Sequence, residues 1–118
     1  MATEGIKGIV LSCDTKGIIT NVIHNELLED RNSIKGRHFP AILHPSSIEK
    51  GFRFIDDINT KLFSFDHYLT IQNAGRRYRL YFIGLKLNDE ILIIGSENHQ
   101  EAFSLIEEMQ KINNEQAN

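Results

Sequence analysis

The stretch LFSFDHYLTIQNAGRRYRLYFIGLKLNDEILIIG, residues 62–95, decides the fold. Apolar and polar residues alternate along residues 63–71, the period of a β-strand with one buried face. Residues 78–87 and 90–95 form two further apolar runs, and turn residues at 72–75 and 88–89 separate the three segments. The middle run is apolar on both faces, which predicts a central strand in a sheet covered on both sides.

A shorter pair of strands precedes this stretch. Residues 8–13 and 17–23 are rich in β-branched and aliphatic residues and are too short for stable helices. Between them, Asp14 can accept a hydrogen bond from the turn backbone, and Gly17 tolerates a positive φ. The sequence therefore predicts a β-hairpin over residues 8–23.

The segment between the two groups of strands carries helical signals. Acidic and apolar residues at 26–30 predict a short helix, and Gly36 with Pro40 limits residues 34–43 to short or irregular turns. Pro45, with Ser46 and Glu49 as a capping box, predicts the start of a longer helix. The apolar stripe expected on that helix comprises Ile48, Phe52, Ile55, Ile58 and Leu62.

A final amphipathic helix is predicted from about residue 98 to residue 115. One apolar stripe along it follows steps of three and four and indicates pairing with a second helix; it comprises Ala102, Leu105, Met109 and Ile112. Phe103 and Ile106 lie beside this stripe and suit the uncovered face of the sheet instead. Pairing in a homodimer and folding back on the domain both remain open.

The composition is that of an ordinary globular domain. The 118 residues are 41% hydrophobic and 25% charged, which is enough for one domain with its own core. The net charge of −3 argues against nucleic-acid binding, so Arg76, Arg77 and Arg79 are interpreted as a solvated strand end. The single Cys13 excludes an intrachain disulfide, and no apolar run is long enough to span a membrane. We therefore expect a cytoplasmic protein.

Three motifs, in register with the element order, resemble those of the PAS sensor domain family. Residues 14–21 (DTKGIITN) are similar to its hairpin and helix entry, and residues 34–39 (IKGRHF) to its hydrophobic-x-Gly-Lys/Arg-x-Phe segment. Residues 43–45 (LHP) resemble the L-x-P that opens its long helix. The resemblance implies an α+β fold in which short helices cover one face of a five-stranded antiparallel sheet. Residues 1–96 would form this sensory domain, and residues 97–118 a helix for signalling and dimerisation.

The residues also limit the chemistry. Five scattered histidines show no metal-site spacing, and neither a nucleophile elbow nor a phosphate-binding glycine loop occurs, so we do not expect an enzyme. Phe39 stands where the family's light-sensing branch carries its reactive cysteine, which excludes an adduct-forming flavin. Haem is not expected, since residues 48–62 contain no histidine. The sequence assigns no other cofactor, and Cys13 is interpreted as a small apolar filler of the core.

The resemblance also implies a pocket between the sheet and the helices. By strand alternation, His67 shares a face with Phe63, Phe65, Leu69 and Ile71. It is therefore either a half-buried edge residue hydrogen-bonded to the backbone or a polar anchor for a ligand, with a side chain that titrates near neutral pH. The full set of candidate lining residues is Phe39, Ile42, Phe52, Ile55, Phe65, His67, Tyr78, Leu80 and Phe82. A mostly apolar pocket and a filled core fit these residues equally well.

Two functions follow from the resemblance. The first is a sensory module of a signalling protein that binds a small ligand or cofactor, forms a homodimer and acts on a downstream effector, with a two-component histidine kinase as the expected one. The second is a ligand-free PAS-type module for dimerisation or protein interaction.

Overall fold

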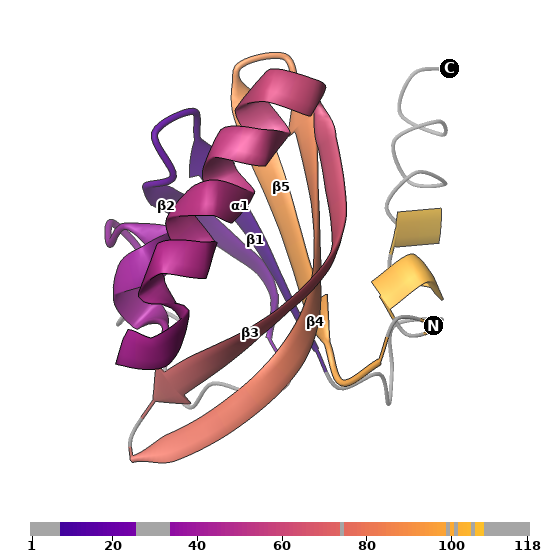
Figure 1. Ribbon diagram of the computed structural model, residues 1–118. Coiled ribbons are helices and arrows are strands. Elements are labelled where there is room, and N and C mark those ends of the chain that lie inside the picture. The colour runs from indigo at the N-terminus through magenta and orange to yellow at the C-terminus, as the bar shows by residue number, and fades with distance from the viewer. Residues whose placement is uncertain are drawn as a thin grey trace.

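The chain forms a curved antiparallel sheet with helices across one face (Figure 1). The computed structural model describes residues 8–25, 34–73, 75–98, 100, 102–104 and 106–107. Along the chain, its helices and strands are β1 (Gly8–Asp14), β2 (Ile19–Asn25), the 3-10 turns η2 (Phe39–Ile42) and η3 (Pro45–Ser47), α1 (Ile48–Lys61), β3 (Phe63–Asn73), β4 (Arg76–Leu87) and β5 (Glu90–Ser96). The short helix predicted at residues 26–30 lies outside the described residues.

The five strands lie in the order β2-β1-β5-β4-β3, and each neighbouring pair is antiparallel. β1 pairs with β5 along its whole length, from Gly8 opposite Ser96 to Asp14 opposite Glu90. The opening hairpin and the three late strands thus form one continuous layer, which confirms the predicted α+β class and five-stranded sheet. β2 and β3 are its two edges.

The β1–β2 turn forms as its sequence predicts. Asp14 Oδ1 accepts hydrogen bonds from the backbone N–H groups of Lys16 and Ile18, both at 2.9 Å. Gly17 has a φ of 92°, in the left-handed region that disfavours a side chain. The hairpin is therefore fixed by local chemistry.

The start of α1 differs from the predicted capping box. Neither Ser46 nor Glu49 closes the box; instead His44 Nδ1 accepts the N–H of Ser46 at 3.2 Å and so caps η3. Ser47 Oγ accepts the backbone N–H of Thr70 at 3.0 Å. The serine thus ties the helix start to β3 rather than to its own first turn.

The buried face of α1 is rotated relative to the predicted stripe. Ile55 and Ile58 are buried as expected, but Phe52 is 50% exposed, and Leu62 lies beyond the helix with a φ of 70°. Phe54 is fully buried in place of Phe52, because Gly51 and Phe54 face η2 and the sheet. Phe52 and Phe54 are two positions apart and therefore lie on opposite faces of the helix, and the predicted stripe contained the phenylalanine that faces away from the sheet.

A β-bulge interrupts β3 near its start. Ser64 is opposite Gly84 and His67 is opposite Phe82, so Phe65 and Asp66 together stand opposite Ile83 alone. One extra residue reverses the alternation, since side chains change face at every step. Ser64 is therefore buried and Phe65 is 53% exposed, which is the opposite of the predicted placement. The expectation that Phe63 and Phe65 share the face of His67 is wrong for this reason.

Two apolar clusters lie on the two faces of the sheet. The larger cluster, beneath α1, contains Phe39, Phe54, Phe82 and the inward residues of β1, β3 and β5. The smaller cluster comprises Val10, Tyr81, Ile83, Ile94, Ala102 and Ile106. Figure 1 shows the described C-terminal helical residues on the side of the sheet opposite α1. The prediction that β4 is covered on both faces is confirmed.

Within the described part of the chain, the longest helix has 14 residues, and no helix is both apolar and long enough to cross a bilayer.

We predict that Gly84→Ala destabilises the fold by about 1–3 kcal/mol, the usual cost of overpacking a core. A methyl group on Gly84 would overlap Ile58 and lie 3.1 Å from Phe54 Cζ. Ile58→Val removes the methyl nearest to that position, so the double variant should lose less than the sum of the two single losses. Urea denaturation measures all three variants. A Gly84→Ala protein within 0.5 kcal/mol of the parent would contradict the close approach of α1 to β4.

Candidate functional site

Most of the predicted pocket residues meet beneath α1. Phe39, Ile42, Ile55, Leu80 and Phe82 are all buried in the larger cluster, and Tyr78 packs against it. The centroid of the Phe82 ring lies 5.5 Å from that of Phe39 and 6.1 Å from that of Phe54, the separations of aromatic rings in contact. Among the described residues, three rings therefore fill the centre of the predicted pocket.

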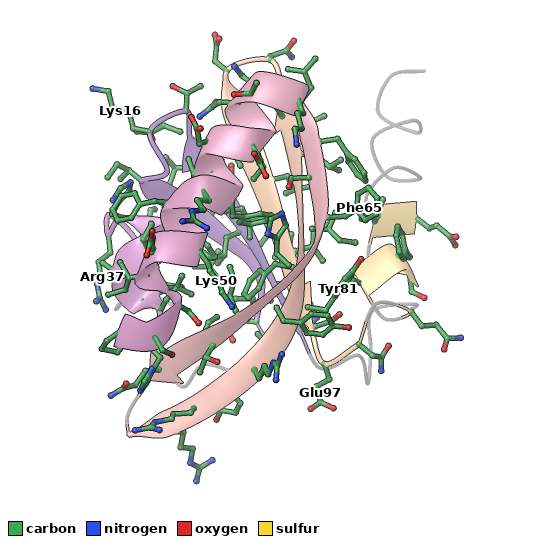
Figure 2. All side chains as sticks on the ribbon, viewed as in Figure 1. Lys16, Arg37, Lys50, Phe65, Tyr81 and Glu97 are labelled. Atoms are coloured by element: carbon green, nitrogen blue, oxygen red, sulfur yellow. The ribbon has the colours of Figure 1, made fainter. Side chains whose placement is uncertain are left out.

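Two predicted lining residues lie elsewhere. The Phe52 ring stands edge-on against His38 on the outside of α1, with 5.2 Å between ring centroids. Figure 2 shows Phe65 pointing to the side of the sheet opposite α1, as Tyr81 does. The bulge accounts for Phe65, and the rotation of α1 accounts for Phe52.

His67 lies where the core meets the surface. Its Nε2 is 2.7 Å from Ser64 Oγ, a hydrogen bond whose direction depends on the tautomer, and its ring centroid is 4.8 Å from that of Phe54. Its side chain is 24% exposed, and Nε2 lies 4.0 Å from Asp57 Oδ2 on α1. The half-buried position of His67 on an edge strand agrees with the prediction, although its hydrogen bond across the bulge is to the Ser64 side chain, whereas the prediction named a backbone partner.

Serine, histidine and aspartate side chains thus lie together without forming a catalytic triad. In a triad, the serine and the carboxylate contact opposite nitrogens of the imidazole. Here both Ser64 and Asp57 are nearest to Nε2, and Ser64 is buried away from solvent. Among the described residues, no three of the His, Cys, Asp and Glu side chains gather in a way that suits a metal ion. The contacts of Ser64, His67 and Asp57 therefore do not have the geometry of an acyl-transfer triad.

An open groove crosses the edge of the sheet beside His67. Its volume is about 160 Å³, and two elements supply its walls: Asp57 and Lys61 from α1, and Phe63, Ser64, Phe65 and His67 from β3. The Phe63 and Phe65 rings lie 5.2 Å apart at an angle of 41°. Lys61 Nζ lies 3.9 Å from Asp57 Oδ1, too far for a hydrogen bond. The groove therefore combines an aromatic wall with the hydrogen-bonded pair Ser64 and His67 and with the Asp57 carboxylate, whose contacts with Lys61 and His67 are 3.9 and 4.0 Å long.

Sequence reasoning found His67 and Phe65 but missed the other four groove residues. The spacing of Asp57 and Lys61, four residues apart on a predicted helix, was an available signal for a shared face. Ser64 had no such signal, because regular alternation placed it on the exposed face.

Cys13 is fully buried in the larger cluster, as its interpretation as a core residue predicted. Burial raises the pKa of its thiol to about 12, with a further contribution from the neighbouring Asp14 carboxylate. A thiol in that environment stays protonated and unreactive at neutral pH.

Of the four residues of the predicted helix-pairing stripe, only Ala102 belongs to the described residues. Ala102 is fully buried against Tyr81, Ile83 and Ile94 of its own sheet, together with Ile106, while Phe103 is exposed. Leu105, Met109 and Ile112 lie outside the described residues. The first turn of the helix therefore covers the sheet, and pairing further along it stays a prediction.

Comparison with solved structures places this fold among PAS and PAS-like domains. The PAS domain of the Cronobacter turicensis quorum-sensing receptor RpfR, solved with BDSF, has a TM-score of 0.64 at 12% identity, over 76% of this chain and 92% of that one. The chromophore-binding domain of Stigmatella aurantiaca bacteriophytochrome has a TM-score of 0.63 at 14% identity, over 77% and 32% of the two chains. At such identities the likeness establishes the fold alone.

A third solved structure is the photoactive yellow protein domain of the Rhodospirillum centenum sensor histidine kinase Ppr. Its TM-score is 0.52 at 14% identity, over 81% of this chain and 99% of that one. In sequence, the succinylglutamate desuccinylase of Idiomarina loihiensis is 33% identical over 72 residues. That match covers 56% of this chain, and the chain spans 21% of the enzyme's length. No protein-family profile matches the sequence.

We predict that Ser64 and His67 stabilise the fold jointly. Ser64→Ala and His67→Leu should each lower the free energy of unfolding, with a coupling of about 1 kcal/mol in a double-variant cycle, the net value of a typical hydrogen bond. Ser104→Ala is the control, because the Ser104 hydroxyl makes an exposed bond to the Gln100 carbonyl and should matter little. Additive losses from Ser64→Ala and His67→Leu would show that the contact contributes nothing.

Proposed function

We propose that this chain is a sensory or regulatory PAS-like module. In this proposal it binds a small ligand or cofactor and relays the event to an effector, such as a histidine kinase, through a homodimer and its C-terminal helix. The ligand shifts the population between two packings of sheet and helix that the domain already samples. The module itself carries out no catalysis.

The fold is the first support for this proposal. Structurally similar domains occur in a quorum-sensing receptor, a phytochrome and a sensor histidine kinase. The sequence match to the desuccinylase involves about a fifth of that enzyme, which fits a module that also occurs inside larger proteins.

The observation that carries the proposal is the way β4 and β5 connect the two apolar clusters. Phe82 faces the larger cluster and its neighbour Tyr81 faces the smaller one, which contains Ile106 of the C-terminal helix. On β5, Ile93 and Ile94 divide in the same way. Because close-packed side chains transmit displacements, a shift beneath α1 would reach the helix through adjacent residues of one strand.

A second candidate function is a ligand-free interaction module. The contact of the Phe39, Phe54 and Phe82 rings favours it, because a filled core beneath α1 was the alternative to a pocket there. An absorbance spectrum and native mass spectrum of purified protein separate the two functions, since a co-purifying molecule would favour the sensor.

We predict that Phe82→Leu changes the methyl chemical shifts of Ile106 on the opposite face of the sheet. Phe52→Leu is the control, because its ring lies outside the core and should leave Ile106 unchanged. Methyl-labelled NMR spectra of the full chain measure both variants. If Phe82→Leu changes the chemical shifts of Phe54 and Ile93 but not those of Ile106, the proposed relay, that is, transmission through β4 from the larger cluster to the C-terminal helix, is wrong.

We predict that Met109→Asp weakens self-association by about tenfold or more, because an interface would have to bury an unpaired carboxylate. Met109→Leu preserves size and polarity and should retain the dimer. Sedimentation velocity across a concentration series measures the dimer. A monomeric parent chain, or an unchanged Met109→Asp dimer, would refute pairing along this stripe.

A further inference from the structure

We propose that the groove formed by Asp57, Lys61, Phe63, Ser64, Phe65 and His67 binds a small organic ammonium ion with an aromatic or compact apolar body. The groove is open to solvent and has a volume of about 160 Å³, so it would enclose a ligand of one ring only in part. A ligand of this size would place one ring in the groove and leave a short polar arm at its rim.

Three features of the groove select positive charge. The Asp57 carboxylate is 37% exposed and makes no contact closer than 3.9 Å with either Lys61 or His67. The groove adjoins the C-terminal end of α1, where the helix dipole amounts to about half a negative charge. The Phe63 and Phe65 rings lie 5.2 Å apart on the wall of the groove and supply aromatic surface, which attracts cations.

The Lys61 side chain already places an ammonium group beside Asp57. Lys61 Nζ lies beside Asp57 Oδ1, but its side chain is 67% exposed and its 3.9 Å separation is that of a weak surface pair. A long, flexible lysine can turn toward solvent, which leaves the Asp57 carboxylate accessible to a ligand. Lys61 therefore lines the groove and competes with the ammonium of a ligand for Asp57.

The same geometry disfavours a carboxylate ligand. An anion placed near Lys61 or His67 would lie close to Asp57, because both nitrogens are within 4.0 Å of the Asp57 oxygens. Repulsion from Asp57 would offset the attraction of either group. Ser64 is already hydrogen-bonded to His67 and would have to break that bond to bind a carboxylate.

This inference rests on the proposed function and names the class of ligand that the sensor would bind. The experiments distinguish a wrong ligand site from a wrong path of transmission through β4 to Ile106. Ligand binding is detected at residues 57–67, whereas the relay is detected at Ile106. If the protein binds an amine and the Ile106 chemical shifts do not change, the amine site is supported and the proposed transmission to Ile106 is wrong.

The test titrates the full chain with three probes that share a phenyl ring and differ in the polar group, with amide shifts recorded by NMR. The probes are 2-phenylethylammonium, 2-phenylethanol and 3-phenylpropionate. The ammonium should produce saturable shifts at residues 57–67, with a dissociation constant about fivefold lower than that of the alcohol. Stronger binding of 3-phenylpropionate, or no saturable ammonium shift up to about 20 mM, which corresponds to only about 2.3 kcal/mol of binding energy, would overturn the proposal.

Variants on α1 separate a specific site from general attraction. Asp57→Asn should weaken ammonium binding about fivefold, whereas Asp56→Asn removes the same charge from the neighbouring exposed position and should leave the affinity unchanged. Lys61→Gln should tighten binding about two- to fivefold, because it removes the competing ammonium. Equal losses in the Asp57 and Asp56 variants, or weaker binding after Lys61→Gln, would overturn the assignment.

Discussion

One extra residue in β3 determines which of its side chains face the core. Between Ser64 and His67 the strand takes three steps while β4 takes two, and every position before the bulge is reversed relative to an unbroken strand. His67 consequently meets Phe54 beneath α1, and Phe65 turns outward at the edge of the sheet. Without the bulge, Ser64 would not reach His67, and the groove would lose its present polar and aromatic groups.

The bulge works together with close packing of α1 on the sheet. Gly84 leaves room for Ile58 and Phe54, and a side-chain carbon on Gly95 would lie only 2.5 Å from the Phe82 ring. These two glycines let aromatic rings lie directly on the backbone of β4 and β5. The filled inner face leaves little freedom to move one ring alone, which is why we propose β4 as the physical link between the two apolar clusters.

Much of this architecture was predictable from local chemistry. Three sequence features correctly predicted the five-stranded sheet: the run at residues 78–87 that is apolar on both faces, the hairpin turn at Asp14 and Gly17, and the order of elements. The bulge was not predictable, because Phe63, Phe65 and His67 continue an unbroken period of two and no glycine marks the interruption. The exposed position of Phe52 was missed because the choice between Phe52 and Phe54 depends on where η2 and β4 lie. The groove joins a helix end to a bulge, so its composition follows from tertiary contacts rather than from a motif.

The most direct test of this account is the β3–β4 pairing register, measured by backbone NOEs in an NMR spectrum of the full chain. The bulged register predicts cross-strand contacts of Ser64 with Gly84 and of His67 with Phe82 in the same protein. Contacts of Asp66 with Phe82 and of His67 with Tyr81 would instead show an unbroken strand. That result would move His67 off the face of Phe54 and contradict the groove that depends on the bulge.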